Sequence, residues 1–440
     1  MLAAVARTLG MPPPGSCGEP EGDGVTGLSA RSWRIGVLIV VGTVLPMGWV
    51  AAPVAAASSP ASHGLAHAPI IYSQVPAPRS RTKPGRPGHG GPKTASVVYT
   101  PLDIQQGYAY GADVGGAGQT IVIVDAYGDP SLLTDLATFD TKFGITPPST
   151  SGAGSLNISY PGGQPTSSNS NWALETALDV EWAHANAPAA TIDLVVTPTS
   201  SFSDLLEGLV SASRLGPTEV SLSWGAPEAD YSASVLGSYQ TALATLFNQG
   251  AVVFSSAGDS GAYDGTHPKT LTVNYPASSP LVVGVGGTTL NLSCSSTSCS
   301  YSGETAWSGS GGGYSSQFPE PAYQTSADIP DSSGGRGVPD VAFDANPSTG
   351  VYVYEAGAWY GVGGTSVGAP NWAAIAADTA ADSKPALTLT SLYASYSSSS
   401  YSSEFHDITS GSNGYYSAGA GWDPVTGIGT PQVAALIAGQ

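Results

Sequence analysis

The sequence predicts an α/β domain with a mostly parallel central sheet and helices on both faces. Apolar runs of strand length alternate with amphipathic stretches of helix length between residues 119 and 380. The apolar runs are continuous rather than alternating, which is typical of strands buried on both faces. Turns rich in Gly and Pro separate the segments, and several helical stretches end at glycine. Such strand–helix alternation favours a parallel sheet enclosed by helices.

The individual elements are predicted from two patterns. We expect strands where apolar runs end in turns, at 119–130, 155–163, 190–196, 219–228, 251–261 and 280–290. We expect helices where apolar residues recur with a period near 3.6, at 131–145, 171–188, 201–216, 232–250 and 364–380. Hairpin-like signals lie at 337–345 and 350–364. Neither a domain break nor an internal repeat is visible after residue 97, so residues 97–440 form one predicted domain.

The composition indicates a globular protein with a strongly acidic domain. Of 440 residues, 41% are hydrophobic and only 10% are charged, so the chain can bury a sizeable core. Residues 97–440 hold five Lys or Arg and 29 Asp or Glu. This charge argues against a nucleic acid as a partner. Many carboxyl groups and few lysines suit an acidic medium, where protonation relieves the repulsion among the acids.

The first 96 residues differ from the rest. Arg31 and Arg34 precede an apolar run that is broken by Gly and Pro and followed by an Ala-x-Ala sequence. We interpret residues 1–57 as a signal-peptide region, with a retained membrane anchor over 35–57 as the alternative. Residues 58–96 are a basic, Pro/Gly-rich linker, expected to be extended and unpacked. The protein is therefore expected to be secreted, without stable membrane association.

The chain has three cysteines, two of them close together in a Ser-rich turn. Cys294 and Cys299 could close a small disulfide loop in an oxidising compartment. Two free thiols are the alternative. The sequence shows no cysteine or histidine spacing that would indicate a zinc or iron–sulfur site.

The helix expected at 171–188 carries two acids on its apolar side. Glu175 and Asp179 lie four residues apart and therefore one turn apart in space. Glu181 and His184 fall on the opposite side, which is expected to face solvent. Burying two like charges is costly, so the pair either lies at a wet rim or takes part in chemistry.

Two further residues follow strands at the edge where active sites of such sheets gather. Asp259 lies in the turn after one strand, and Ser366 lies among glycines at a helix start. Ser366 could act as a nucleophile or as a helix N-cap. None of the six histidines has a flank typical of a catalytic base, so the available bases are the paired acids. Asp125, at the end of the first strand, is interpreted as structural.

Four motifs, in order, resemble those of the sedolisin family, the serine-carboxyl peptidases with a subtilisin-like fold. The resemblance covers about residues 97–440. The motifs are ETALDVEWAHANAP (175–188), SWG (223–225) with SSAGDSG (255–261), GGTSVGAP (363–370), and FHDITSGSNGYYSAGAGWDPVTGIGTP (405–431).

The resemblance implies a role for each candidate residue. Ser366 would attack the peptide carbonyl and Glu175 would take its proton, with Asp179 orienting Glu175. Asp259 would help to stabilise the oxyanion. A carboxylic acid donates to an oxyanion only when it is protonated, and the base must be partly ionised. Because a close pair of acids shares a proton, we predict an acidic pH optimum and little activity near neutrality.

The resemblance also implies one structural calcium ion near the carboxyl terminus. Asp407 and Asp423 would supply carboxylates, and Ile408, Gly419 and Gly421 would supply carbonyl oxygens, which are the hard ligands that Ca²⁺ prefers. The segment does not match an EF-hand loop, and without the resemblance it reads equally as a Gly-rich surface loop.

These observations predict a secreted, calcium-stabilised, acid-acting endopeptidase that cleaves polypeptides and is expected to be a monomer. One alternative is a conventional Ser-His-Asp hydrolase. Another is a non-catalytic secreted binding protein on the same scaffold. The latter is retained because sedolisins usually carry a long folded pro-region, whereas residues 58–96 are short. The sequence leaves open whether the enzyme is an endopeptidase or releases tripeptides.

Overall fold

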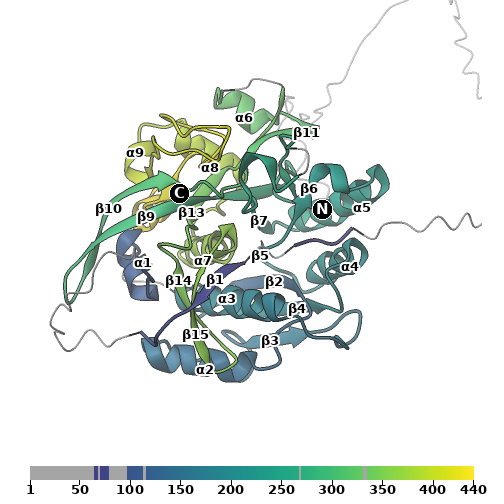
Figure 1. The fold of residues 1–440 in the computed structure, drawn as a ribbon, viewed down its shortest axis with the longest axis vertical. Helices are drawn as coiled ribbons and strands as arrows, with labels where there is room; N and C mark the ends of the chain where they lie inside the picture. Colours follow the sequence, from purple (N-terminus) through teal and green to yellow (C-terminus); the bar gives the residue numbers. More distant parts are fainter. Residues whose placement is uncertain (1–63, 68–69, 79–96, 112–114, 267–268, 331–333) are drawn as a thin grey trace, which may run out of the picture. The chain divides into compact units, whose positions relative to one another are not determined.

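An eight-stranded sheet forms the centre of the protein (Figure 1). The computed structural model describes residues 64–67, 70–78, 97–111, 115–266, 269–330 and 334–440. The described residues all belong to one unit, Ala61–Gln440. The predicted signal-peptide region, 1–57, lies outside the described residues.

The sheet is mostly parallel, as predicted. Its strand order is β10-β9-β7-β5-β2-β4-β3, and β13 pairs with β9. Only the pairing of β10 with β9 is antiparallel. The strands are β2 (Thr120–Ala126), β3 (Leu156–Ser159), β4 (Thr191–Thr197), β5 (Glu219–Leu222), β7 (Val252–Ser256), β9 (Val282–Cys294), β10 (Cys299–Ala306) and β13 (Val341–Asp344).

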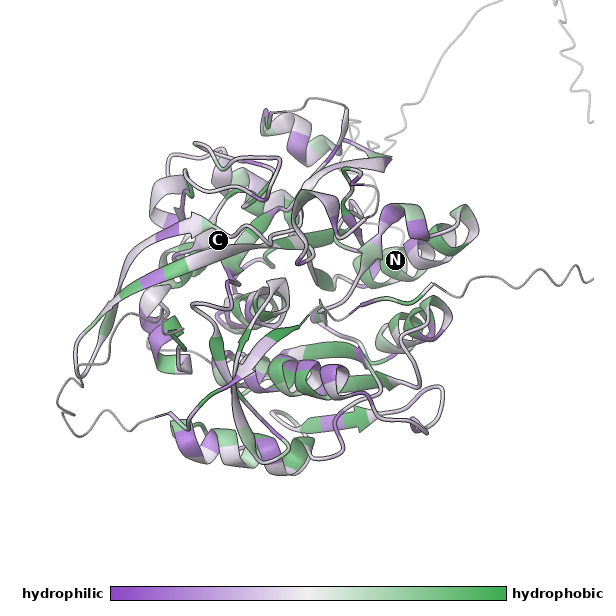
Figure 2. Ribbon diagram, in the orientation of Figure 1, coloured by the Kyte–Doolittle hydropathy of each residue, from purple (hydrophilic) through white to green (hydrophobic). Residues whose placement is uncertain are grey.

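Helices cover both faces of this sheet. On one face lie α3 (Ser170–Asn186) and α7 (Gly368–Ala381), and on the other lie α4 (Phe202–Ala212) and α5 (Ala233–Asn248). Successive residues of β2 serve the two faces in turn: Ile121 packs with α3 and α7, whereas Val122 packs with α4 and α5. Figure 2 shows the resulting hydrophobic strands β2 and β4 between helices of mixed character.

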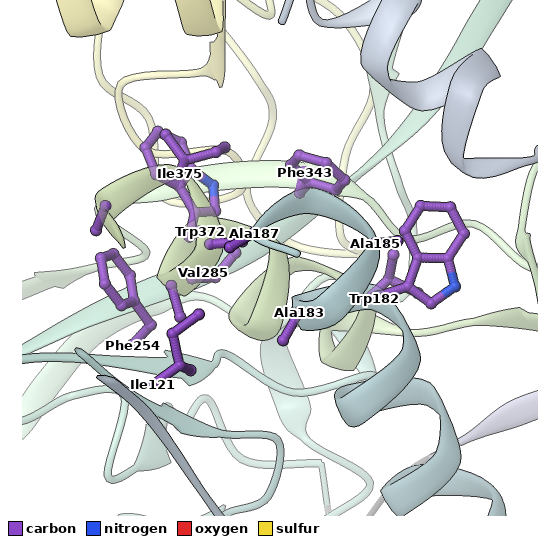
Figure 3. Packing of buried hydrophobic residues seen from close by; sticks show 14 of the residues in the cluster. Ile121, Trp182, Ala183, Ala185, Ala187, Phe254, Val285, Phe343, Trp372 and Ile375 are labelled. Atoms are coloured by element: carbon purple, nitrogen blue, oxygen red, sulfur yellow. The ribbon is translucent and has the colours of Figure 1, made fainter. Parts of the chain in front are cut away.

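The core between α3, α7 and the sheet is densely packed. Figure 3 shows Trp372 and Ile375 of α7 with Phe254 of β7 and Val285 of β9. Gly368, the first residue of α7, lies so close to the sheet that a Cβ atom would come within 2.5 Å of the Val285 side chain. This close approach fixes the start of α7, and hence the preceding residues, against the carboxyl ends of the strands.

Helix α3 is enclosed on all sides, which corrects one expectation. Glu181 and His184 were expected to face solvent, but their exposed fractions are 0% and 1%. The outer side of α3 is covered by α2 (Leu132–Phe143) and by the hairpin of β14 (Val351–Glu355) and β15 (Ala358–Gly363). Glu181 accepts a hydrogen bond from the Tyr354 amide at 3.1 Å, and His184 contacts the carboxylate of Asp140 at 3.5 Å. The amphipathic pattern did not predict this burial because α2 and the β14–β15 hairpin, which cover the outer side of α3, lie outside the helix in the sequence.

The remaining elements form small sheets and helices around this core. The segment 337–345 does not form its own hairpin, because β13 joins the main sheet and the preceding strand pairs elsewhere. Cys294 and Cys299 form a disulfide at the turn between β9 and β10. The other elements are β1 (Ile71–Gln74), β6 (Ala226–Pro227), β8 (Asn274–Tyr275), β11 (Gly313–Pro319), β12 (Gly335–Val338), β16 (Phe405–His406), β17 (Thr430–Pro431), α1 (Pro101–Gly107), α6 (Ala322–Ser326), α8 (Leu389–Tyr396), α9 (Tyr401–Glu404) and α10 (Val433–Gly439).

Part of the predicted linker is paired with the domain. Within 58–96, residues 64–67 form bridges to two loops, and β1 pairs with β15 (Figure 1). These residues are extended, as the composition indicates, but they are hydrogen-bonded rather than unpacked. Among the described residues, no helix is both long and apolar enough to cross a membrane.

Candidate active site

Ser366 lies in a single 3₁₀ turn, Thr365–Val367, between β15 and α7. Gly364 precedes this turn with φ = 119°, a backbone conformation that side chains disfavour, so glycine permits the sharp change of direction. The expected N-cap role does not hold, because the N-cap position of α7 is Val367 and no side chain caps it. The Ser366 hydroxyl is buried and makes no hydrogen bond of regular geometry.

Helix α3 brings the two paired acids to this turn. Asn169 caps the helix by accepting hydrogen bonds from the amides of residues 171 and 172. Two turns further on, Glu175 and Asp179 are both fully buried, so the wet-rim interpretation is wrong. Ser223 Oγ donates a hydrogen bond to Asp179 Oδ1 at 2.8 Å. Ser223 Oγ also lies 3.4 Å from the Ser366 carbonyl oxygen. Ser223 therefore links this acid to the serine turn.

Glu175 is the acid that interacts with the serine. Neither of its carboxyl oxygens has a hydrogen bond of regular geometry with a described residue. Burial raises its pKa well above the usual value, and the charges of Asp125 and Asp259 raise it further. The Ser366 hydroxyl acts in the opposite direction, because its proximity as a hydrogen-bond donor lowers the pKa of Glu175. The Ser366 hydroxyl and the Glu175 carboxyl group thus lack any other hydrogen-bond partner among the described residues.

Asp259 reaches the serine turn from the loop after β7. Its Oδ1 accepts a hydrogen bond from the Thr365 amide at 2.7 Å and another from the Thr365 hydroxyl at 2.8 Å. Its other oxygen, Oδ2, is buried and without a hydrogen-bond partner among the described residues. Burial raises the pKa of Asp259 to about 7, against the opposing effect of the two Thr365 bonds. Below that pH the carboxyl group carries a proton that Oδ2 can donate.

Asp125 belongs to the same cluster, which its interpretation as a structural residue did not anticipate. It is fully buried, and burial raises its pKa to about 7, partly opposed by the Thr176 hydroxyl. Its charge also raises the pKa of Glu175 and of Asp179. The structural interpretation is therefore incomplete: Asp125 is electrically coupled to the paired acids. Its position at the carboxyl end of β2, next to two other such strand ends, is the signal that could have revealed this.

None of the three described histidines is hydrogen-bonded to the serine. His67 pairs through its backbone with Gly225. His184 contacts Asp140 and the Thr146 carbonyl oxygen. His406 stacks on Tyr301 at 3.7 Å, and burial lowers its pKa to about 4. Among the described residues, the ionisable groups gathered around Ser366 are therefore carboxyl groups.

The residues expected to bind calcium lie together in the carboxyl-terminal loops. Asp407 accepts the Gly421 amide at 3.1 Å, and Asp423 accepts the Gly419 amide at 3.4 Å. Burial raises the pKa of Asp423 to about 6. Within the described chain, no donor reaches the carbonyl oxygens of Ile408, Gly419 or Gly421. Two carboxylates and three free carbonyl groups form an all-oxygen donor set, which fits the coordination that Ca²⁺ prefers.

Comparisons with known proteins agree with this geometry. Residues 73–400 match the model of the subtilase family, and the chain therefore belongs to that family. Within it, the chain is a member of the sedolisin family. It is 35% identical over 358 residues to kumamolisin of Bacillus sp. strain MN-32, and 31% identical over 349 residues to sedolisin of Pseudomonas sp. strain 101. The resemblance inferred from the four motifs is thereby confirmed.

The matched regions cover most of this chain but less of its relatives. The kumamolisin alignment covers 77% of this chain and 62% of that protein, and the sedolisin alignment covers 73% and 58%. A solved structure of Pseudomonas sedolisin, a serine-carboxyl proteinase in complex with pseudo-iodotyrostatin, superimposes with a TM-score of 0.70 at 29% identity. That match covers 78% of this chain and 98% of the solved chain. The predicted subtilisin-like fold is confirmed.

Proposed function

We propose that the protein is a serine-carboxyl endopeptidase that hydrolyses polypeptides in acid. The observation that carries this proposal is that Ser366 Oγ and both carboxyl oxygens of Glu175 are buried without a hydrogen-bond partner among the described residues, while the Ser366 hydroxyl lowers the pKa of Glu175. A serine needs a base to become nucleophilic at ordinary pH. Membership of the sedolisin family supports a carboxylate in that role.

The proposed reaction proceeds through an acyl-enzyme. Ser366 Oγ bonds to the peptide carbonyl carbon while its proton passes to Glu175. Asp259, protonated below its pKa of about 7, donates from Oδ2 to the developing oxyanion. Glu175 then gives its proton to the leaving amine as the C–N bond breaks. Glu175 then takes a proton from water as the water oxygen bonds to the ester carbon. It passes that proton to Ser366 Oγ as the bond between Oγ and the carbonyl carbon breaks, which releases the carboxylic acid and restores Ser366.

Asp179 supports Glu175 by electrostatics and position. The two acids lie one helical turn apart. The charge of Glu175 raises the pKa of Asp179, and the charge of Asp125 raises the pKa of both. Two buried carboxyl groups at this spacing titrate as a pair that retains a proton. Ser223 fixes Asp179 by its hydrogen bond and leaves the second oxygen, Oδ2, without a described partner. Activity therefore requires a partly protonated cluster, which favours acidic pH.

We also propose that one Ca²⁺ ion binds Asp407, Asp423 and the carbonyl oxygens of Ile408, Gly419 and Gly421. The free carbonyl groups support this assignment. When bound, the ion would cross-link the loops that contain these residues and so stabilise the fold. The ion would take no part in peptide hydrolysis.

We further propose that the protein is secreted. The disulfide between Cys294 and Cys299 supports an oxidising compartment. The acidic composition of residues 97–440 suits an acidic extracellular medium.

Digestion of a reduced, alkylated protein at about pH 4 tests the peptidase proposal. We expect the wild-type protein to cleave it and the Ser366→Ala variant to be inactive. A control at another buried hydroxyl, Ser255→Ala, should retain most activity. Absence of activity in the wild-type protein would favour the binding-protein alternative. Equal activity in the wild type and the Ser366→Ala variant would also contradict the proposal.

A further inference from the structure

A chain of side-chain amides ends at the serine turn. The Val367 carbonyl oxygen, next to Ser366, accepts a hydrogen bond from Asn371 Nδ2 of α7 at 2.7 Å. Asn371 Oδ1 accepts in turn from Nδ2 of Asn186, the last residue of α3, at 2.5 Å. Asn186 Oδ1 accepts from Gln105 Nε2 of α1 at 3.0 Å. These three side chains, the amide relay, therefore connect α1, α3 and α7 to the serine turn.

The Val367 carbonyl group fixes the direction of every bond in the amide relay. A carbonyl oxygen can only accept, so Asn371 must present its NH₂ group to it. Asn371 Oδ1 is then left to accept from Asn186, and Asn186 Oδ1 is left to accept from Gln105. Turning over one asparagine amide alone would set like groups against each other. The relay therefore has a single arrangement.

The amide relay crosses an apolar part of the core. Ala185, Ala187 and Trp372, which are chain neighbours of the two asparagines, are all buried. Figure 3 labels these three residues where α3 lies against α7. Both asparagines are fully buried, yet each nitrogen and oxygen of their side chains has a partner. Because an unpaired amide is costly in such surroundings, the two side chains stabilise only the arrangement in which they meet.

The residues around the two asparagines do little to fix α3 along α7. Ala183 lies one turn before Asn186, and Ala374 lies one turn after Asn371, so each alanine shares the face of an asparagine. Both alanines are fully buried. Small apolar side chains form no directional bonds and allow one helix to shift along another at little cost. A buried pair of asparagines opposes such a shift, as a single polar residue fixes the register of a coiled coil.

We propose that Asn186 and Asn371 are positioning residues that set the register of α3 on α7 and thereby hold Glu175 in place beside Ser366. This inference rests on the proposed peptidase function. Glu175 lies on the same continuous helix as Asn186, so a shift of the helix at one residue moves the other by a similar amount. Proton transfer requires the two reacting groups to be nearly in contact, and a misplacement of about 1 Å can cost about 100-fold in rate.

Steady-state kinetics of Asn371→Leu on a peptide substrate at about pH 4 test this role. Leucine has nearly the shape of asparagine but forms neither bond. We expect kcat to fall about 100-fold and KM to change less than about threefold, because the relay acts on the reacting groups rather than on substrate binding. Equal kcat for wild type and Asn371→Leu would overturn the proposal.

Gln324→Met is the matched control for the loss of a buried amide. Gln324 lies on α6, is fully buried and donates to the Gly337 carbonyl oxygen at 2.8 Å. We expect this variant to lower the melting temperature, as Asn371→Leu does, but to leave kcat within about twofold of wild type. Equal losses of kcat in the two variants would show a general effect of destabilisation and overturn the positioning role.

Asn371→Asp separates the hydrogen bonds from the packing. A protonated carboxyl group can donate to the Val367 carbonyl oxygen and accept from Asn186, as the amide does. Burial raises the pKa of such a group, so it retains its proton at about pH 4. We expect Asn371→Asp to keep kcat within about fivefold of wild type at this pH. A loss as large as that of Asn371→Leu would contradict the relay.

Asn186→Leu provides a second variant if Asn371→Leu does not fold. It breaks the bond between α3 and α7 and leaves the bond to Val367 in place, so we expect a similar loss of kcat. The wild-type result separates the two proposals. No cleavage by the wild type would contradict the peptidase and, with it, this role. Cleavage by the wild type with unchanged kcat in both leucine variants would retain the peptidase and overturn the positioning role.

Discussion

Asp259 accepts a 2.7 Å hydrogen bond from the backbone amide of Thr365, the residue immediately before Ser366. Oδ1 accepts this bond. The other carboxyl oxygen, Oδ2, has no hydrogen-bond partner among the described residues. An acid from the β7 loop is thus attached to the serine turn before any substrate arrives. Such preorganisation is what oxyanion stabilisation requires, because the donor need not reorient during the reaction.

Replacing Asp259 by Asn tests whether its proton limits the enzyme at high pH. The side-chain oxygen of Asn can still accept both Thr365 bonds, and its amide can donate at every pH. For wild type, we expect kcat/KM to fall as pH rises through about 7, where Asp259 ionises. Asp259→Asn should retain measurable activity and move this loss to higher pH. The same high-pH limb in both proteins would exclude Asp259 as the donor.

Asp125→Asn tests the electrical coupling of Asp125 to the paired acids. Because the Asp125 charge, which is present above its pKa of about 7, raises the pKa of Glu175 and Asp179, its removal should move the high-pH limb of kcat/KM down by about one unit. Asp378→Asn is the matched control, since Asp378 is also buried with a pKa of about 7 but bonds to the Gly115 amide. A purely structural role for Asp125 would change the melting temperature and leave the limb in place.

The buried acids also predict that the protein is most stable in acid. Burial raises the pKa of Asp125 and Asp259 to about 7, and that of Glu219 to about 8, above unfolded values near 4. The folded state therefore binds more protons than the unfolded state between these values, so stability is complete below about pH 4. It is lost as pH rises through the folded pKa values.

Thermal unfolding of the Ser366→Ala protein between pH 3 and 8 measures this dependence without self-digestion. A chelator should be present throughout, because calcium binding would otherwise stabilise the protein at the higher pH values. We expect the melting temperature to be highest near pH 4 and to fall toward pH 8. A maximum at pH 7 or above would contradict the assignment of raised pKa values to these acids.

Calcium removal tests the carboxyl-terminal site. A ligand at about 100 times its Kd stabilises a protein by about 2.7 kcal/mol, which corresponds to a melting temperature shift of about 2–4 °C. We expect a chelator at pH 7 to lower the melting temperature of Ser366→Ala by this amount. Asp423→Asn should abolish the difference, and Asp264→Asn, which alters an acid in another loop, should retain it. An unchanged melting temperature would contradict the site.

The centre of the fold could be predicted from the sequence because its central strands lie within continuous apolar runs. The strands at 120–126 and 191–197 are buried on both faces, so the run itself marks the element. The surroundings of Glu181 and His184 could not be predicted in this way. Their cover comes from α2 and from the β14–β15 hairpin, and a single helix pattern carries no information on a second layer.

The site was partly predictable for a similar reason. Glu175 and Asp179 are neighbours on one helix, so their spacing is visible in the sequence. The roles of Ser223 and Asp125 depend on three strand ends meeting at one edge, which only the strand order defines. The pairing of residues 64–67 and of β1 with the domain was hidden for a different reason. Its contacts are made by the backbone, and Pro/Gly-rich composition does not report them.

The proposed mechanism makes Glu175, rather than a histidine, the base for Ser366. The most direct measurement is kcat/KM of Glu175→Gln at about pH 4, beside Glu181→Gln, which changes a second fully buried glutamate of the same helix. A general base contributes about 10²–10⁴-fold to the rate. We expect a loss of this size for Glu175→Gln and a loss of less than about tenfold for Glu181→Gln. Near-normal activity of Glu175→Gln would contradict the proposed mechanism.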